Sequence, residues 1–284
     1  MAETLIGSTF DGGRYRVDKH LQGEGLRQLY LGSDAATTDA VLISYDKLPK
    51  YTTIEDFIAA NKAPVPGVLD LLFAGTPDGE PSYWGVIERV PQNARWMPDV
   101  LGRHPPHTVT DSVPKRLPSF EPGGAVARAL AFGRSAGRVL ADSAARGAIL
   151  ARVRPETMWI TGDRVVGLSQ RSELMFSASW VTAFSMPVFD RYYYAPEVGR
   201  NQHVDDRALV FSLSIMIAEW ATGLYPFAKK SFDGGPTENQ QVALDLPPQL
   251  AALLGAGMNV SVATRPSLAA FLDELERCVD PSAK

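Results

Sequence analysis

Residues 204–227, VDDRALVFSLSIMIAEWATGLYPF, decide the fold. The stretch from 208 to 221 is apolar except for Ser212, Ser214 and Glu219. It is too short and too often interrupted for the ~18 to 20 apolar residues that a helix needs to span a bilayer. A helix that is apolar on all faces is typical of the core of a large protein. We therefore predict that this stretch is a buried helix.

Helical periodicity recurs on both sides of this stretch. With the buried helix itself, the predicted helices are Asp206–Thr222, Val126–Arg146, Pro247–Ala256 and Pro266–Val279. Two short apolar runs, Met158–Ile160 and Val165–Leu168, flank Thr161-Gly162-Asp163-Arg164, which is typical of a hairpin turn. The second part of the chain is therefore predicted to be mostly helical.

The first 90 residues have a different pattern, with short apolar or alternating runs separated by polar breaks. Five strands are predicted: Tyr15–Leu21, Gln28–Ser33, Val41–Tyr45, Val68–Ala74 and Tyr83–Val90. One helix, Thr53–Lys62, follows the third strand and precedes Pro64.

Together these patterns predict one α+β domain with two lobes. The small lobe, 1–90, is a five-stranded sheet with one helix, and the larger lobe, 91–284, is mostly helical. Residues 91–124 are rich in proline, glycine and charge, and are predicted to form an irregular insertion after the hinge between the lobes.

Composition restricts the class of protein. The net charge is −4, which gives no overall attraction to nucleic acid or to anionic lipid. The single cysteine, Cys278, excludes an internal disulfide framework and suits a reducing compartment. No signal peptide or membrane-spanning run is apparent. We expect a cytoplasmic protein without direct membrane insertion.

The order of the segments resembles the bacterial Ser/Thr (Hanks-type) protein-kinase family over nearly the whole chain. The matching segments lie at 12–34, 65–90, 145–168, 192–198 (YYYAPEV, with an intact A-P-E), 204–227 and 263–275 (ATRPSLAAFLDEL). The resemblance implies a bilobal kinase-like fold, whereas function has to be argued from the site itself.

Four positions that carry phosphoryl transfer in the family are occupied here by other residue types. Ser44 stands at the place of the lysine in the V-A-I-K strand, and Arg152 at the place of the base aspartate in the H-R-D loop. Thr157 and Ser169 replace the asparagine and the D-F-G aspartate, which bind metal in the family. A guanidinium cannot act as a base, and magnesium requires hard oxygen ligands. The resemblance therefore implies a pseudokinase that is not an enzyme and has no cofactor or metal.

Other matched positions favour retention of the structure or a different ligand. Glu197 of A-P-E is expected to pair with Arg265, as in the family, and to be structural. In the glycine-rich loop Arg27 replaces the third glycine. Together with Arg152 and Arg154 it could contact an anion such as a phosphate group.

We therefore predict a catalytically inactive protein-binding module that does not bind Mg·ATP. The expected partner is another protein, either an active kinase or a phosphopeptide-binding protein. Residues 91–124 and the aromatic-rich 180–194 are the candidate contact surfaces. One alternative is a metal-independent nucleotide or anion sensor that uses the arginines. Another is rewired chemistry such as nucleotidyl transfer, which would need carboxylates in the cleft that the sequence does not reveal.

Overall fold

The computed structural model describes residues 5–24, 27–47, 54–61, 64, 66–79, 83–100, 125–145, 153–169, 193–199, 204–223, 225–227 and 245–279. These residues fall into two compact units. Unit 1 contains the described residues up to Arg95 together with Val166–Ser169. Unit 2 contains those from Trp96 to Val165 and from Tyr193 onward.

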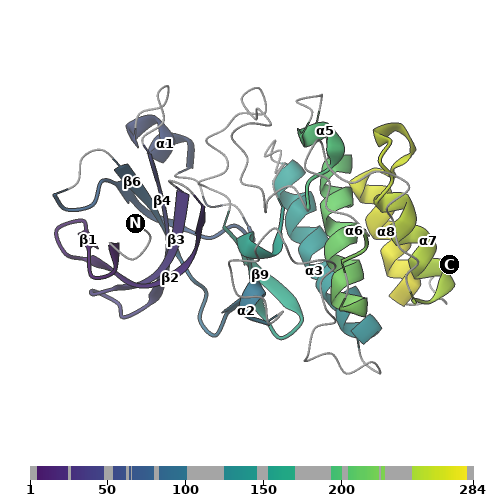
Figure 1. The fold of residues 1–284 in the computed structure, drawn as a ribbon, viewed down its shortest axis with the longest axis horizontal. Coiled ribbons are helices and arrows are strands. Elements are labelled where there is room, and N and C mark those ends of the chain that lie inside the picture. Colours follow the sequence, from purple (N-terminus) through teal and green to yellow (C-terminus); the bar gives the residue numbers. More distant parts are fainter. Residues whose placement is uncertain are drawn as a thin grey trace. The chain divides into compact units, whose positions relative to one another are not determined.

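The described part of unit 1 is an antiparallel sheet with one helix (Figure 1). Its six strands lie in the order β1-β2-β3-β4-β6-β5. They are β1 (Thr9–Phe10), β2 (Tyr15–Glu24), β3 (Arg27–Asp34), β4 (Ala40–Lys47), β5 (Leu71–Gly75) and β6 (Tyr83–Arg89), with helix α1 (Ile54–Asn61) between β4 and β5. The five predicted strands and the predicted helix are present. The additional strand β1 has two residues, which is too short to produce an alternating pattern.

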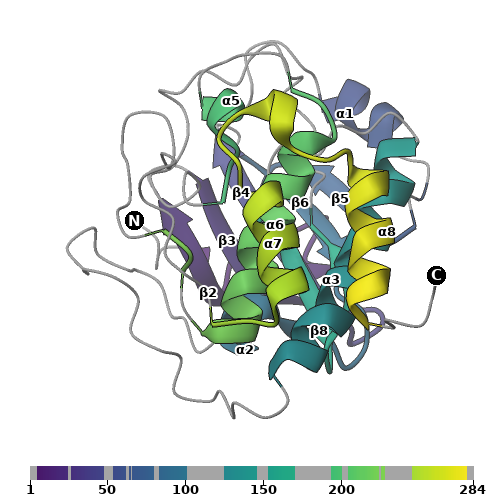
Figure 2. The ribbon, with the colours of Figure 1, turned by 90° about the vertical axis from the view of Figure 1, so that its right-hand side faces the viewer.

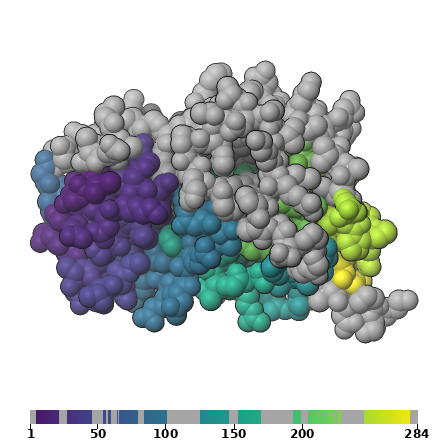
Figure 3. All heavy atoms as spheres, turned by 60° about the horizontal axis from the view of Figure 1, so that its bottom comes forward, coloured from purple at the N-terminus to yellow at the C-terminus, as the bar shows by residue number. Residues whose placement is uncertain are grey.

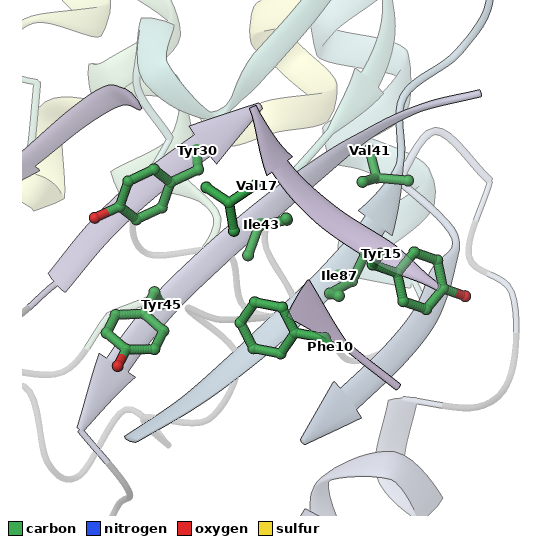
Figure 4. Close-up of a cluster of buried hydrophobic side chains, with 8 residues drawn as sticks. All are labelled: Phe10, Tyr15, Val17, Tyr30, Val41, Ile43, Tyr45 and Ile87. Carbon is green, nitrogen blue, oxygen red and sulfur yellow. The ribbon is translucent and has the colours of Figure 1, made fainter. Parts of the chain in front are cut away.

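One face of this sheet carries the core of unit 1 (Figure 4). Successive side chains of a strand point to opposite faces, so Val41, Ile43 and Tyr45 of β4 share this face. They pack with Phe10, Tyr15, Val17, Tyr30 and Ile87. The opposite face carries Leu42 and Ser44 of β4, because these residues alternate with the core positions. This second face contains the candidate site.

An ion pair between an exposed arginine and a buried aspartate lies at the open end of the β2–β3 hairpin. Arg14 donates through Nε to Asp34 Oδ1 at 3.3 Å and through Nη2 to Oδ2 at 3.2 Å. The backbone N–H of Ala36 donates to the same carboxylate at 2.9 Å. The hydrogen bond from Arg14 holds the pKa of Asp34 below its ordinary value.

Unit 2 is built on α6, the helix predicted from 204–227. Its described elements are β7 (Arg95–Trp96), α2 (Met97–Val100), α3 (Ala125–Ala145), β8 (Met158–Thr161), β9 (Arg164–Leu168, which continues into unit 1), α5 (Pro196–Gly199), α6 (Arg207–Thr222), α7 (Pro248–Gly257) and α8 (Leu268–Val279). Every residue of α6 from Ala208 to Ala221 is buried. Helices α3, α7 and α8 lie against it (Figure 2). The all-round apolar pattern therefore predicted its environment correctly.

Glycines allow close helix packing at two places, between α3 and α8 and between α7 and α6. A Cβ atom at Gly137 of α3 would lie 2.2 Å from Leu272 Cδ2, and one at Gly257 of α7 would lie 2.0 Å from Ser214 Oγ. Such distances are far shorter than van der Waals contact, so no larger side chain fits without displacing its neighbour.

None of the helices in the described part of the chain is long and apolar enough to cross a membrane.

The strands of unit 1, in purple and blue, and α7, in yellow-green, reach the surface on the face that Figure 3 shows.

Candidate functional site

Ser44 lies on β4 with its side chain on the face opposite the core of unit 1. It is paired across the sheet with Val86 of β6. The side chain is buried, and its Oγ has no hydrogen-bond partner among the described residues. A short hydroxyl at this position supplies no cation to a phosphate group.

The same face contains a carboxylate that the sequence analysis missed. Glu88 of β6 is paired with Leu42, two residues before Ser44, so Glu88 and Ser44 are diagonal neighbours on one face. Glu88 is 0% exposed. Its Oε2 accepts a hydrogen bond of 2.6 Å from Ser169 Oγ, which is also buried. Two of the four predicted positions therefore lie near a glutamate: Ser169 is hydrogen-bonded to Glu88, and Ser44 is its diagonal neighbour on the sheet.

Ser169 reaches Glu88 because the end of β9 pairs with the edge of unit 1. Leu69 N–H donates to the carbonyl of Leu168 at 2.9 Å, and Leu168 N–H donates to the carbonyl of Gly67 at 2.7 Å. Val68 and Leu168 form a parallel bridge. Two segments about a hundred residues apart in sequence are thus joined by backbone hydrogen bonds directly before Ser169.

One sequence signal could have identified Glu88. In Tyr83–Arg89 (YWGVIER), Trp84, Val86 and Glu88 alternate and share a face. Trp84 and Val86 are buried together with Ala74. An acid at the third position of an otherwise apolar, buried face requires a hydrogen-bonding partner. The alternation was recognised as a strand, but the acid was not treated as a buried group.

The arrangement can accept and donate hydrogen bonds, and Glu88 offers one hard oxygen ligand. Among the described residues no three His, Cys, Asp or Glu side chains are grouped closely enough to hold a metal ion. A carboxylate at this place also disfavours a nearby phosphate, because both are negatively charged.

The remaining predicted positions are described only in part. Thr157, in unit 2, is buried, and its Oγ1 donates to the carbonyl of Arg154 at 2.8 Å, closing a short 3₁₀ turn. Arg154 is buried as well. Arg152 and the side chain of Arg27 lie outside the described residues. The anion site predicted from the three arginines therefore stays a prediction. So do the contact surfaces predicted at 91–124 and 180–194, of which 101–124 and 180–192 lie outside the described residues.

Glu197 and Arg265 form a buried ion pair in unit 2. The two nitrogens Nη1 and Nη2 of Arg265 donate to Oε1 and Oε2 of Glu197 at 2.8 and 2.5 Å. Nη1 also donates to the carbonyl of Arg207 at 2.8 Å, and the guanidinium lies 5.2 Å from the ring centroid of Phe211. The pair links α5 to the turn before α8 and to α6.

Tyr193, just before α5, is held by α6 in a similar way. Its hydroxyl donates to Glu219 Oε2 at 2.8 Å, and its backbone carbonyl accepts from Ser212 Oγ at 2.7 Å. All three residues are buried. Two of the polar residues that interrupt the apolar helix, Ser212 and Glu219, thus form hydrogen bonds with Tyr193.

Comparison with known proteins supports the assignment of the fold. No protein-family model and no curated protein sequence matches the chain. Among the many solved structures that match it are two of the Mycobacterium tuberculosis PknI kinase domain, which match along nearly its full length. A double-mutant form has 21% identity and a TM-score of 0.62 over 96% of this chain and 97% of that one. The other structure has 19% identity and a TM-score of 0.58 over 96% and 98%. The prediction of a bilobal fold like that of bacterial Ser/Thr kinase domains is confirmed.

One prediction is wrong. The chain was expected to be no enzyme, whereas the solved structures that share its fold are kinase domains. Loss of the catalytic residues is not established, since Arg152 lies outside the described part and Glu88 adds a carboxylate beside Ser169. The physical reason for the error is that each position was judged by its residue type alone, without the neighbours that the fold supplies.

Proposed function

We propose that the chain is a regulatory module of the cytoplasm that acts by binding another protein. The observation that carries this proposal is the buried hydrogen bond between Ser169 and Glu88. It joins Ser169 to the carboxylate of Glu88, and the negative charge of this carboxylate is unsuited to a phosphate group. Meanwhile the pairs that hold unit 2 together, Glu197 with Arg265 and Tyr193 with Glu219, are fully formed. A unit that keeps these internal contacts can present a stable binding surface to another protein.

The partner class proposed is an active kinase or a phosphopeptide-binding protein. The test is titration of the purified full chain, by isothermal calorimetry, against a panel of purified kinases and phosphopeptide-binding domains from the same cell. We expect one saturable complex. Replacing the aromatic residues of 180–192 with serine should weaken it at least about tenfold, whereas replacing the exposed Ile6 or Ile58 should not. Failure of every member of the panel to bind would refute the proposal.

The likeness to kinase domains favours kinase activity as a second candidate function. It is tested in the same preparation with labelled ATP and magnesium. Transfer of the label that follows the chain through two chromatographic steps, and that needs no partner, would establish this activity. Partner binding without transfer would support the regulatory role.

A further inference from the structure

Residues 5–13, which precede β2, are fastened to unit 1 by an acid from another part of the chain. Asp78, an exposed residue after β5, accepts a hydrogen bond of 2.7 Å from Thr9 Oγ1. The same carboxylate accepts from the backbone N–H groups of Gly12 at 3.3 Å and Gly13 at 3.1 Å. These bonds, with that from Thr9 first, hold the pKa of Asp78 below its ordinary value. One side chain thus binds both the strand β1 and the turn that follows it.

The backbone around β1 marks off a separate segment. Gly12 and Gly13 have φ angles of 62° and 91°, and Gly7, on the other side of β1, has a φ of 91°. Glycine adopts such angles at little cost, so the chain turns sharply at both ends of β1. Strand β1 pairs with β2 through its two residues only, whereas β2 is paired with β3 along Tyr15–Glu24. The pairing of β2 therefore does not depend on β1.

Phe10 connects this segment to the core of unit 1 (Figure 4). The side chain is 0% exposed, and its ring lies edge-on to that of Phe73 with centroids 6.5 Å apart. A Cβ atom at Gly85 would lie 2.6 Å from Phe10 Cε1, so the sheet has space for this ring only because residue 85 is glycine. Leu5 packs against the same cluster. Departure of the segment would therefore uncover apolar surface on Phe73 and Tyr15.

We propose that residues 5–13 form a detachable latch on the core of unit 1, and that the carboxylate of Asp78 controls its release. When the bonds to Asp78 are broken, the latch opens and uncovers the surface beneath Phe10, while the rest of the sheet stays folded. This conformational device goes beyond the proposed function, because it needs no bound partner and lies on the core side of the sheet.

The experiment is hydrogen exchange of the full chain, followed by NMR so that single amides are resolved. The reporters are the amides of Gly7 and Val17, which donate the hydrogen bonds that join the latch to β2. In Asp78→Ala we expect both to exchange about tenfold faster. The amide of Arg89 in β6, which is hydrogen-bonded outside the latch, should be unchanged. Binding of the apolar dye ANS should increase in the same variant.

Asp18→Ala is the matched control, because it removes another carboxylate of unit 1, which accepts a hydrogen bond of 2.8 Å from Arg16. It should leave the amides of Gly7 and Val17 unchanged. Thr9→Val removes one of the three donors to Asp78 and should give a smaller acceleration than Asp78→Ala. Thr9→Ser keeps the hydroxyl and should exchange like the unaltered chain.

Three results would overturn the proposal. Unchanged exchange at Gly7 and Val17 in Asp78→Ala would show that the carboxylate does not hold the latch. Equal acceleration at Arg89 would show that the whole sheet opens together. Faster exchange without increased dye binding would show that release leaves the surface beneath Phe10 covered.

Discussion

The buried pair of Glu197 and Arg265 gives the sharpest stability prediction. Two hydrogen bonds link the side chains, which are 2% and 0% exposed. Each hydrogen bond to a charged group contributes about 1.5 to 3 kcal/mol. Removing one partner of such a pair leaves a buried charge, at a cost of about 3 to 5 kcal/mol. We expect Glu197→Ala to lower the free energy of unfolding of unit 2 by this amount.

The measurement is urea unfolding followed by far-UV circular dichroism, which reports mainly the helices of unit 2. The control is the pair of Arg134 and Glu276, whose side chains are 36% and 42% exposed. Glu276→Ala should cost less than about 1 kcal/mol. The double variant Glu197→Leu with Arg265→Met should be more stable than Glu197→Ala alone, since no charge is left buried without its partner. Equal, small losses for Glu197→Ala and Glu276→Ala would refute this reasoning.

Three further predictions follow from other contacts. Gly257→Ala should destabilise the chain by about 1 to 3 kcal/mol, because the new Cβ would lie 2.0 Å from Ser214 Oγ; Ser214→Gly should recover much of this loss in the same urea assay. The hydrogen bond from Arg14 lowers the pKa of Asp34 in the folded chain, so its stabilisation is present above the unfolded pKa of about 3.9 and is lost as the pH falls through the folded value. Asp34→Asn should therefore make the urea midpoint less dependent on pH below about 4, and an unaltered pH profile would count against the Arg14 contact. ATP should raise the melting temperature by less than about 2 °C, since Ser44 supplies no cation; a larger rise that requires magnesium would support kinase activity, and one that survives a chelator would support the arginine sensor.

Much of the fold was predictable from the sequence because its signals are local. The short apolar run at Val41–Tyr45 and the largely apolar character of α6 are each visible from neighbouring residues alone. The pairing of Glu197 with Arg265 was expected only because the chain resembles kinases. No local pattern could give the contact between Val68 and Leu168, since it depends on how two distant segments meet.

The candidate site was predictable only in part for the same reason. Ser44 and Ser169 were located by the resemblance, but their meaning depends on Glu88, which lies on a third segment. A carboxylate on an apolar strand indicates that a donor must exist, without indicating which residue provides it. The partner, Ser169, becomes evident only when the sheet and the end of β9 are placed together.

The pairing of Leu168 with Gly67 and Leu69 also determines how the chain can be divided. A fragment ending at Arg95 would include the whole six-stranded sheet but would lack Val166–Ser169. Its edge would then expose the Leu69 amide and the Gly67 carbonyl, and unpaired groups of this kind promote association between chains. A peptide of residues 164–169 supplied in trans should complement that edge, as in a split protein. The amino-terminal third of the sequence thus needs one further short strand to complete its described sheet edge.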